Sequence, residues 1–265
     1  MISTIESIYH FLFAITLGVA RLYPCLFLIP IFSFTVVKGM LRNIVVITLA
    51  LVPATAIQQQ LMVTDLSWLI LTGLLLKEMV VGLLLGSLLS MPFWMFESVG
   101  ALFDNQRGAL IGGQLNPALG RDVTPLGHLL KETFILLLIL TIGISGPMQV
   151  IWDSYQIWPP LQWLPPLSEQ GFHTYLDLLK ETFSHMVVYA GPLVALLLLL
   201  EFSIAMLSLY SPQLQVYVLS VPAKCLAGMS FFIVYMPVVQ FLAEGRIMAL
   251  PDLKYLLPLF FSVQP

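Results

Sequence analysis

The sequence predicts an all-α, membrane-associated protein built from six to eight apolar helical segments. Of its 265 residues, 59% are hydrophobic and 9% are charged, and the mean hydropathy is +0.95. A soluble domain of this length would carry roughly 66 charged residues, at about 25%. Six stretches of 18 to 22 residues lack Asp, Glu, Lys and Arg, close to the ~20 apolar residues that cross a bilayer as a helix. No period-two alternation occurs in them, so strands of a membrane barrel are not expected.

The apolar runs define the expected helices in order along the chain. The first run, residues 8–37, is interrupted only by Arg21. As one helix it would be about 45 Å long, but Pro24 and Pro30 predict a kink or a helical hairpin there. Residues 152–166 carry three tryptophans and two Pro-Pro pairs and predict a cap at the water–lipid boundary. The six charge-free stretches are residues 43–64, 79–96, 133–152, 182–200, 202–223 and 225–243.

Charge and motif content exclude several classes of function. The net charge is -3 and no run of Lys or Arg occurs, so nucleic acid is not an expected partner. Cys25 and Cys225 lie far apart in apolar stretches, which is typical of buried free thiols rather than of a disulfide or a metal pair. The chain has no His-Glu-x-x-His pair, nucleophile elbow or phosphate-binding loop. We therefore expect no catalytic residue, cofactor or metal.

Charged side chains inside apolar segments allow two interpretations. They could line an ion path or a proton relay, or they could pair between helices or between subunits, buried in protein. We adopt the second interpretation for Arg21, Lys77, Glu78, Glu201 and Lys224. Adjacent residues do not face each other on a helix, so Lys77 and Glu78 are expected to mark the boundary of an apolar run.

Two further patterns concern packing and a break in the helices. Gly82, Gly86 and Ser90 recur every four residues and predict close packing against another helix. Residues 100–127 contain six glycines and two prolines but keep apolar side chains such as Leu110, Ile111 and Leu115. Irregular backbone of this kind suits either a hydrophobic constriction that seals a cavity and moves, or a surface loop that packs its leucines onto helix ends.

Several landmarks, in this order and spacing, make the chain similar to a known family from about residue 8 to 245. They are Arg21 with Pro24 and Pro30; Lys77-Glu78 with Gly82 and Gly86; residues 103–108 (Phe-Asp-Asn-Gln-Arg-Gly); Glu201; residues 211–213 (Ser-Pro-Gln); and Pro222 with Lys224. The chain resembles the SctT/FliR family, export-apparatus subunits of type III secretion systems. The segment Asp104 to Gly108 resembles the injectisome branch more than the flagellar one.

The resemblance implies a bacterial inner-membrane protein in a hetero-oligomeric stack. Residues 1–184 would form a part similar to SctR, residues 185–245 a helical hairpin similar to SctS with its turn at Pro212 and Gln213, and residues 246–265 a C-terminal tail. The implied partners are SctR-like and SctS-like subunits, an SctU-like switch protein, unfolded secreted proteins and membrane lipid. The family's helices need not all lie in the membrane plane.

The resemblance also implies a loop that plugs a closed pore. By position the plug is residues 104–122, and the residues expected to act in it are Asp104, Gln106, Arg107, Gly108, Leu110, Ile111, Gly112, Gly113, Leu115, Asn116 and Pro117. Many relatives have an acid where this chain has Asn116, so the resemblance implies no role for a negative charge at that position in this chain.

The sequence thus predicts a non-enzymatic pore component that admits unfolded proteins to a secretion channel. One alternative is a secondary transporter of small solutes that uses Glu201 and Lys224 as coupling charges. An intramembrane enzyme is a second alternative, although no motif marks its nucleophile, base or metal.

Overall fold

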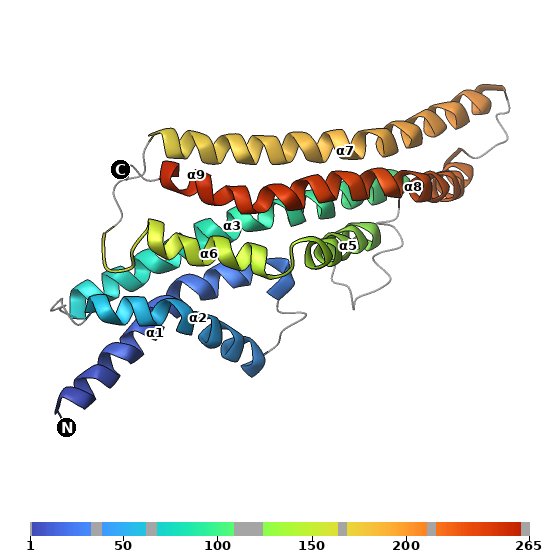
Figure 1. The fold of residues 1–265 in the computed structure, drawn as a ribbon. Coiled ribbons are helices and arrows are strands. Elements are labelled where there is room, and N and C mark those ends of the chain that lie inside the picture. Colours follow the sequence, from blue (N-terminus) through green and yellow to red (C-terminus); the bar gives the residue numbers. More distant parts are fainter. Residues whose placement is uncertain are drawn as a thin grey trace. The chain divides into compact units, whose positions relative to one another are not determined.

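A computed structural model describes residues 2–32, 39–61, 68–108, 124–163, 169–210 and 216–260. All regular structure in these ranges is helical, which confirms the predicted all-α class. Figure 1 shows the helices: α1 (Ile2–Leu28), η1 (Pro30–Phe32), α2 (Met40–Leu61), α3 (Trp68–Arg107), α5 (Pro125–Thr141), α6 (Ser145–Ile157), α7 (Glu169–Tyr210), α8 (Val216–Ala249), η3 (Leu250–Asp252) and α9 (Leu253–Phe260).

Five of the described helices are long and apolar enough to cross a membrane. They are α1, α2, α3, α7 and α8, the last taken together with the residues that follow it to Phe260. The pair α5 and α6 makes a sixth candidate if it is counted as one span. The backbone of Gly143, between these two helices, has φ of 69°, a left-handed conformation that glycine adopts without steric cost.

The helices are longer than the charge-free stretches predict. Helix α3 has 40 residues where the sequence indicated 79–96, and α7 has 42 residues and runs through Glu201. The reason is that a charged side chain with a partner does not end a helix. Helix α1 likewise continues past Pro24 and ends at Leu28, before Ile29, because the residue that precedes a proline disfavours the α conformation.

The chain divides into two compact units. Unit 1 comprises Met1–Met91, Ile142–Asp177 and Ala249–Pro265, and unit 2 comprises Pro92–Thr141 and Leu178–Met248. Helices α3, α7 and the end of α8 contribute residues to both. Each unit is described separately.

In unit 1, α1 and α2 form an antiparallel pair and α3 runs parallel to α1. The amide of Gln58 donates to Ser7 O at 3.3 Å, and the Arg42 guanidinium donates to the Tyr23 hydroxyl at 2.5 Å. The residue near the start of α1 contacts the end of α2, and the residue near the end of α1 contacts the start of α2. The two helices therefore run antiparallel. Tyr9 contacts Trp68 and Cys25 contacts Gly86, so numbers rise together along α1 and α3.

The C-terminal helix α9 closes unit 1 by packing on α6. Leu257 and Phe260 are its buried side chains, an apolar pair three residues apart on one helix face. The backbone of Phe260 lies against Gly171 at the start of α7, so closely that a Cβ on Gly171 would collide with the Phe260 carbonyl oxygen. Glycine at this position therefore permits the helix end to dock.

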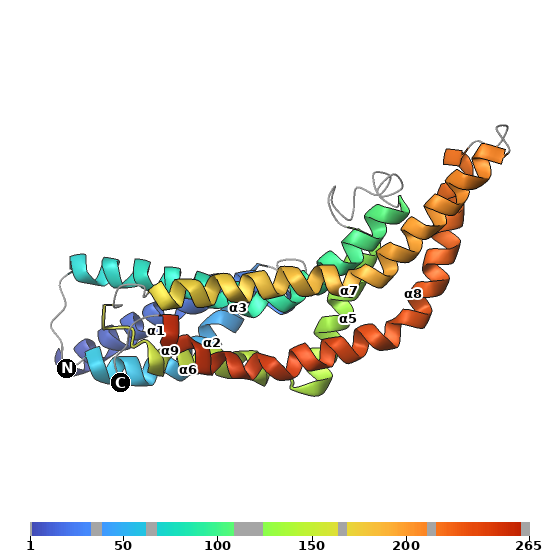
Figure 2. The same ribbon diagram turned by 90° about the horizontal axis from the view of Figure 1, so that it is seen from above.

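In unit 2, the second half of α3 packs antiparallel to α5 and α8, and α7 packs antiparallel to α8. Along α7 and α8 three side-chain contacts keep one register: Glu181 with Arg246, Tyr189 with Tyr235, and Glu201 with Lys224. The paired numbers add to nearly the same value, as they must in a helical hairpin. Helix α8 curves along its course (Figure 2) and contains Pro222 and Pro237, which each remove a helical hydrogen bond.

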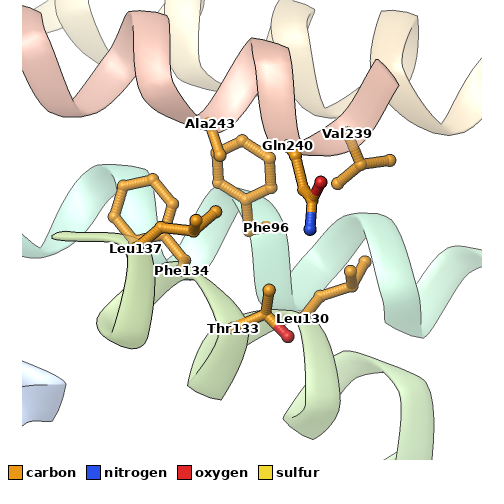
Figure 3. Close-up of a pocket in the computed structure, with 8 residues that line it drawn as sticks. All are labelled: Phe96, Leu130, Thr133, Phe134, Leu137, Val239, Gln240 and Ala243. Carbon is orange, nitrogen blue, oxygen red and sulfur yellow. The ribbon is translucent and has the colours of Figure 1, made fainter. Parts of the chain in front are cut away.

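Aromatic rings form the core of unit 2. The ring centroids of Phe93 and Phe96 lie 4.9 and 4.8 Å from that of Phe134, which joins α3 to α5. Phe103 stacks on Phe232 of α8 at 5.8 Å and is fully buried. Figure 3 shows the residues that line a crevice between α3, α5 and α8, of which Thr133 and Gln240 are polar. Its volume is about 10 Å³, space for about one water molecule.

Candidate functional site

Arg21, Lys77 and Glu78 form one buried charge cluster in unit 1. Arg21 of α1 and Glu78 of α3 make a two-pronged ion pair, with Nε to Oε2 at 2.5 Å and Nη2 to Oε1 at 2.9 Å. Both side chains are fully buried. Two parallel hydrogen bonds between a guanidinium and a carboxylate give a strong and directional contact.

The remaining Arg21 donors bind the end of α6. Nη1 donates to the Ser154 hydroxyl at 3.1 Å, and Nη2 donates to the Trp158 carbonyl at 2.7 Å. The guanidinium carbon lies 4.2 Å from the centre of the Tyr155 ring. Arg21 therefore joins three helices of unit 1, α1, α3 and α6, through a single side chain.

Lys77 adds a second cation to this cluster. Its Nζ lies 2.7 Å from Glu78 Oε1 and donates to the carbonyls of Pro160 at 2.7 Å and Gln162 at 2.9 Å. The expectation that Lys77 and Glu78 only mark a boundary is wrong for this pair: the flexible lysine stem turns back onto the neighbouring carboxylate. Two cations share one carboxylate, and backbone carbonyls stabilise the excess positive charge. The cluster thus fixes the segment after α6 onto α3.

Gly82 and Gly86 lie where α3 meets α1. A Cβ on Gly82 would collide with the carbonyl oxygen of Arg21 and lie 2.7 Å from Pro24 Cγ, and one on Gly86 would lie 2.9 Å from the Cα of Cys25. Their lack of side chains allows the approach that brings Arg21 within reach of Glu78. Ser90, on the same stripe, is buried, and its hydroxyl has no hydrogen-bond partner among the described residues.

A second polar cluster, in unit 2, lies at the end of α3 and the start of α5, the helices that precede and follow residues 109–123 in the sequence. We call it the neck and define it by Asp104, Gln106, Arg107, Leu126, Glu201 and Lys224. Asp104 is fully buried near the end of α3. One of its oxygens accepts from Arg107 Nε at 2.8 Å, and the other accepts from the backbone N–H of Leu126 at 2.7 Å. Asp104 therefore caps the start of α5, where a free N–H and the helix dipole favour an anion.

The other half of the neck holds the last turn of α3 on α8. Lys224 Nζ lies 3.0 Å from Glu201 Oε2 and 3.4 Å from the carbonyl oxygen of Gln106. The Cys225 thiol lies 3.9 Å from the carbonyl oxygen of Arg107. Carbonyls at a helix C-terminus have no helical partner and favour a cation. Lys224, on the neighbouring helix α8, therefore supplies a cation to the carbonyl of Gln106 at the end of α3.

Glu201 differs from its prediction as a buried charge. Its side chain is 49% exposed, whereas that of Lys224 is 10% exposed. Lys224 and Gln106 approach it through the same carboxylate oxygen.

The structure thus gathers the predicted charges into two groups. Arg21, Lys77 and Glu78 meet in unit 1, and Glu201 and Lys224 meet in unit 2 beside the described plug residues Asp104, Gln106, Arg107 and Gly108. Nine predicted residues lie outside the described ranges: Leu110, Ile111, Gly112, Gly113, Leu115, Asn116, Pro117, Pro212 and Gln213.

Sequence reasoning missed the partners that complete each group. These are the Ser154 hydroxyl, the carbonyls after α6 and the N–H of Leu126. The carbonyls and the N–H are backbone groups, which carry no residue-type signal, so no motif could have identified these partners. Within the described ranges, no group of three His, Cys, Asp or Glu side chains could hold a metal ion.

The fold and these clusters define a helical protein with several helices long and apolar enough to span a membrane, in which the charged groups of the two clusters pair with one another. A model of the family described as bacterial export proteins, family 1, matches residues 12–250. The chain therefore belongs to this family of bacterial export proteins, which confirms the resemblance to SctT and FliR.

Individual relatives favour the injectisome branch. The chain is 31% identical to the Yop proteins translocation protein T of Yersinia pestis, over 92% of this chain and 94% of that protein. It is 30% identical to the surface presentation of antigens protein SpaR of Salmonella typhimurium, over 82% and 81%. Identity to the flagellar biosynthetic protein FliR of Bacillus subtilis is 25%, over 62% of this chain and 63% of that protein. These comparisons assign the chain to protein export and secretion.

Proposed function

We propose that the chain is a non-enzymatic component of a type III export gate, in which residues 104–122 plug a pore for unfolded proteins. The observation that carries this proposal is the neck. A plug must close reliably and still be displaced, so its two ends need a fixed base. Asp104 joins the end of α3 to the start of α5, the helices on either side of segment 109–123. Lys224 attaches the same base to α8.

The proposed mechanism is steric. Leu110, Ile111 and Leu115 would fill the lumen at rest, and Gly112 and Gly113 would let the loop swing aside when a substrate enters. Hydrophobic constrictions exclude water and ions, so the closed state would not leak. The driving energy would come from other components of the apparatus.

The proposed partners are those that the resemblance to the family implies. Residues 185–245 would be the SctS-like hairpin and residues 1–184 the SctR-like part, so the chain would join SctR-like and SctS-like subunits and receive an SctU-like protein. The register of α7 and α8 supports a hairpin in this region. The assembly would sit in the bacterial inner membrane and project toward the periplasm. The half-exposed Glu201 would be free to pair with a neighbouring subunit.

The test removes the proposed plug while keeping the neck. Deletion of residues 109–120 should raise ion leakage across the membrane while the chain still co-purifies with SctR-like and SctS-like subunits. Asp104→Asn, which weakens the bond to Arg107 but keeps the size of the side chain, should raise leakage to a smaller extent. The matched control is Asp153→Asn, an aspartate of α6 outside the neck. An assembled complex that does not leak after the deletion would refute the plug.

The transporter alternative uses Glu201 and Lys224 as coupling charges. In the structure both charges have a packing role at the neck, so no separate observation favours transport. Glu201→Gln distinguishes the two functions: a transporter would lose solute uptake while its assembly is unchanged, whereas an export-gate subunit would show weaker assembly or no defect.

A further inference from the structure

The carboxylate of Glu201, on α7, is only half satisfied within unit 2. Its side chain is 49% exposed. Both of its contacts use one oxygen, Oε2, which lies 3.0 Å from Lys224 Nζ and 3.5 Å from the amide nitrogen of Gln106. The other oxygen, Oε1, has neither a hydrogen bond nor an ion pair with any residue that the structure describes. A donor from another molecule can therefore bind Oε1 without displacing Lys224.

The charges around Glu201 favour a cation as that donor. The Lys224 ammonium serves two negative groups, because it also lies 3.4 Å from the carbonyl oxygen of Gln106 in the last turn of α3. The carbonyl end of a helix carries roughly half an elementary negative charge. Arg107, in the same turn, pairs with Asp104, so their charges cancel. The carboxylate and the helix end together exceed the one positive charge of Lys224.

Exposed apolar side chains surround Glu201 along α7. Leu198, Phe202 and Leu209 are 51%, 67% and 71% exposed, and Ala205 is exposed as well. Leu198 lies three residues before Glu201 and Ala205 four residues after it, positions that share a helix face. Contiguous exposed apolar surface marks an interaction site, and a carboxylate that faces lipid hydrocarbon is costly. The surroundings of Glu201 therefore suit a protein partner and not a lipid surface.

From these observations we propose that residues 198–209 of α7 dock a helix of a neighbouring subunit that is apolar except for one Lys or Arg opposite Glu201. Docking would bury the carboxylate, which is unfavourable unless a counter-ion accompanies it. Glu78 in unit 1 shows the completed arrangement, since it is fully buried and pairs with two cations, Arg21 and Lys77. This inference rests on the proposed function, which gives the chain neighbouring subunits, and it adds the surface and the chemistry of the partner.

The first experiment compares two matched carboxylates of α7. Glu181 is 48% exposed and pairs with Arg246 at 2.8 Å, much as Glu201 pairs with Lys224, but polar side chains such as His185 lie near it in the sequence. The chain is co-expressed with its export-apparatus subunits, and mass spectrometry measures how much of each co-purifies in mild detergent. Glu201→Gln should lower the co-purified amount about fivefold or more, and Glu181→Gln less than twofold. Equal losses overturn the proposal.

A second variant blocks the surface without changing the ion pair. Ala205→Trp adds a large side chain at an exposed position beside Glu201, so folding does not depend on it. It should lower the co-purified amount about fivefold or more while the midpoint of thermal unfolding of the isolated chain stays unchanged. Wild-type co-purification by Ala205→Trp overturns the proposal, and this test holds even if Glu201→Gln fails to fold.

A photo-crosslink identifies the partner's cation. A benzophenone amino acid at position 205 is irradiated in the co-expressed assembly, and the attached peptide is sequenced. It should be an apolar segment with one Lys or Arg, and replacing that cation by Glu should restore co-purification to Glu201→Lys. An adduct without a cation, or only with lipid or with a second copy of this chain, overturns the proposal while the export-gate function stands. A wild-type chain that co-purifies with no export-apparatus subunit refutes the proposed function itself.

Discussion

Replacing Glu78 by glutamine leaves the buried guanidinium of Arg21 without its counter-ion. The wild-type carboxylate accepts two hydrogen bonds from Arg21 and contacts Lys77 Nζ at 2.7 Å, with no solvent exposure. Glutamine has nearly the same shape, so little packing changes and the loss is electrostatic. Removing one partner of a buried ion pair costs about 3–5 kcal/mol. The Ser154 hydroxyl and the Trp158 carbonyl still bind Arg21, so we expect the lower end, about 3 kcal/mol.

The assay is thermal unfolding of the purified chain in detergent, followed by circular dichroism. For a chain of this size, about 3 kcal/mol corresponds to a midpoint roughly 6–12 °C lower. The matched control is Glu97→Gln, which breaks the ion pair of Glu97 with Lys131. That pair has a similar distance, 2.8 Å, but its side chains are 31% and 18% exposed, so the expected loss is below about 1 kcal/mol.

A double-mutant cycle separates the ion pair from the packing. Arg21→Met alone should be as destabilising as Glu78→Gln, because it leaves the carboxylate with Lys77 as its only cation. The double variant Arg21→Met with Glu78→Gln should lose less than the sum of the two, with a coupling energy of about 2 kcal/mol or more. Additive losses, or a loss from Glu78→Gln no larger than that from Glu97→Gln, would refute the reasoning that these charges stabilise unit 1.

Two further predictions concern glycines at close contacts. Gly82→Ala places a methyl group against the Arg21 carbonyl oxygen and Pro24, so it should destabilise the chain by about 2 kcal/mol in the same thermal assay. The control is Gly191→Ala, on α7 with open space around it, which should stabilise the chain by up to about 1 kcal/mol. Equal effects of the two substitutions on stability would contradict the packing described. Gly171→Val collides with the Phe260 carbonyl oxygen and should release α9, seen as faster amide hydrogen exchange over residues 253–260 and unchanged exchange in unit 2.

Some features of the fold were predictable because they follow from composition and spacing. A shortage of charge over lengths near 20 residues indicates membrane helices whatever the tertiary structure. The ordered landmarks from Arg21 to Lys224 indicated the family, which the comparisons confirm. The glycines at 82 and 86 indicated close helix packing, because spacing by four residues places them on one helix face.

Helix ends were predicted less well, and the charges explain why. The sequence treated Lys77-Glu78 and Glu97 as limits of an apolar run, yet α3 continues through both positions. Each has a partner on another segment: the carbonyls after α6 bind Lys77, and Lys131 pairs with Glu97. Whether a charge ends a membrane helix depends on whether such a partner exists, and that is a property of the folded chain.

By itself, then, the sequence determined the all-helical class, the family and the residue types available for pairing. Only the tertiary structure decided which charges meet: Arg21 with Glu78 from 57 positions away, and Asp104 with the N–H of Leu126. The physical reason is that hydrophobicity and helix period are local properties of the chain, whereas a buried charge is satisfied by groups brought from distant segments, many of them backbone atoms that every residue shares.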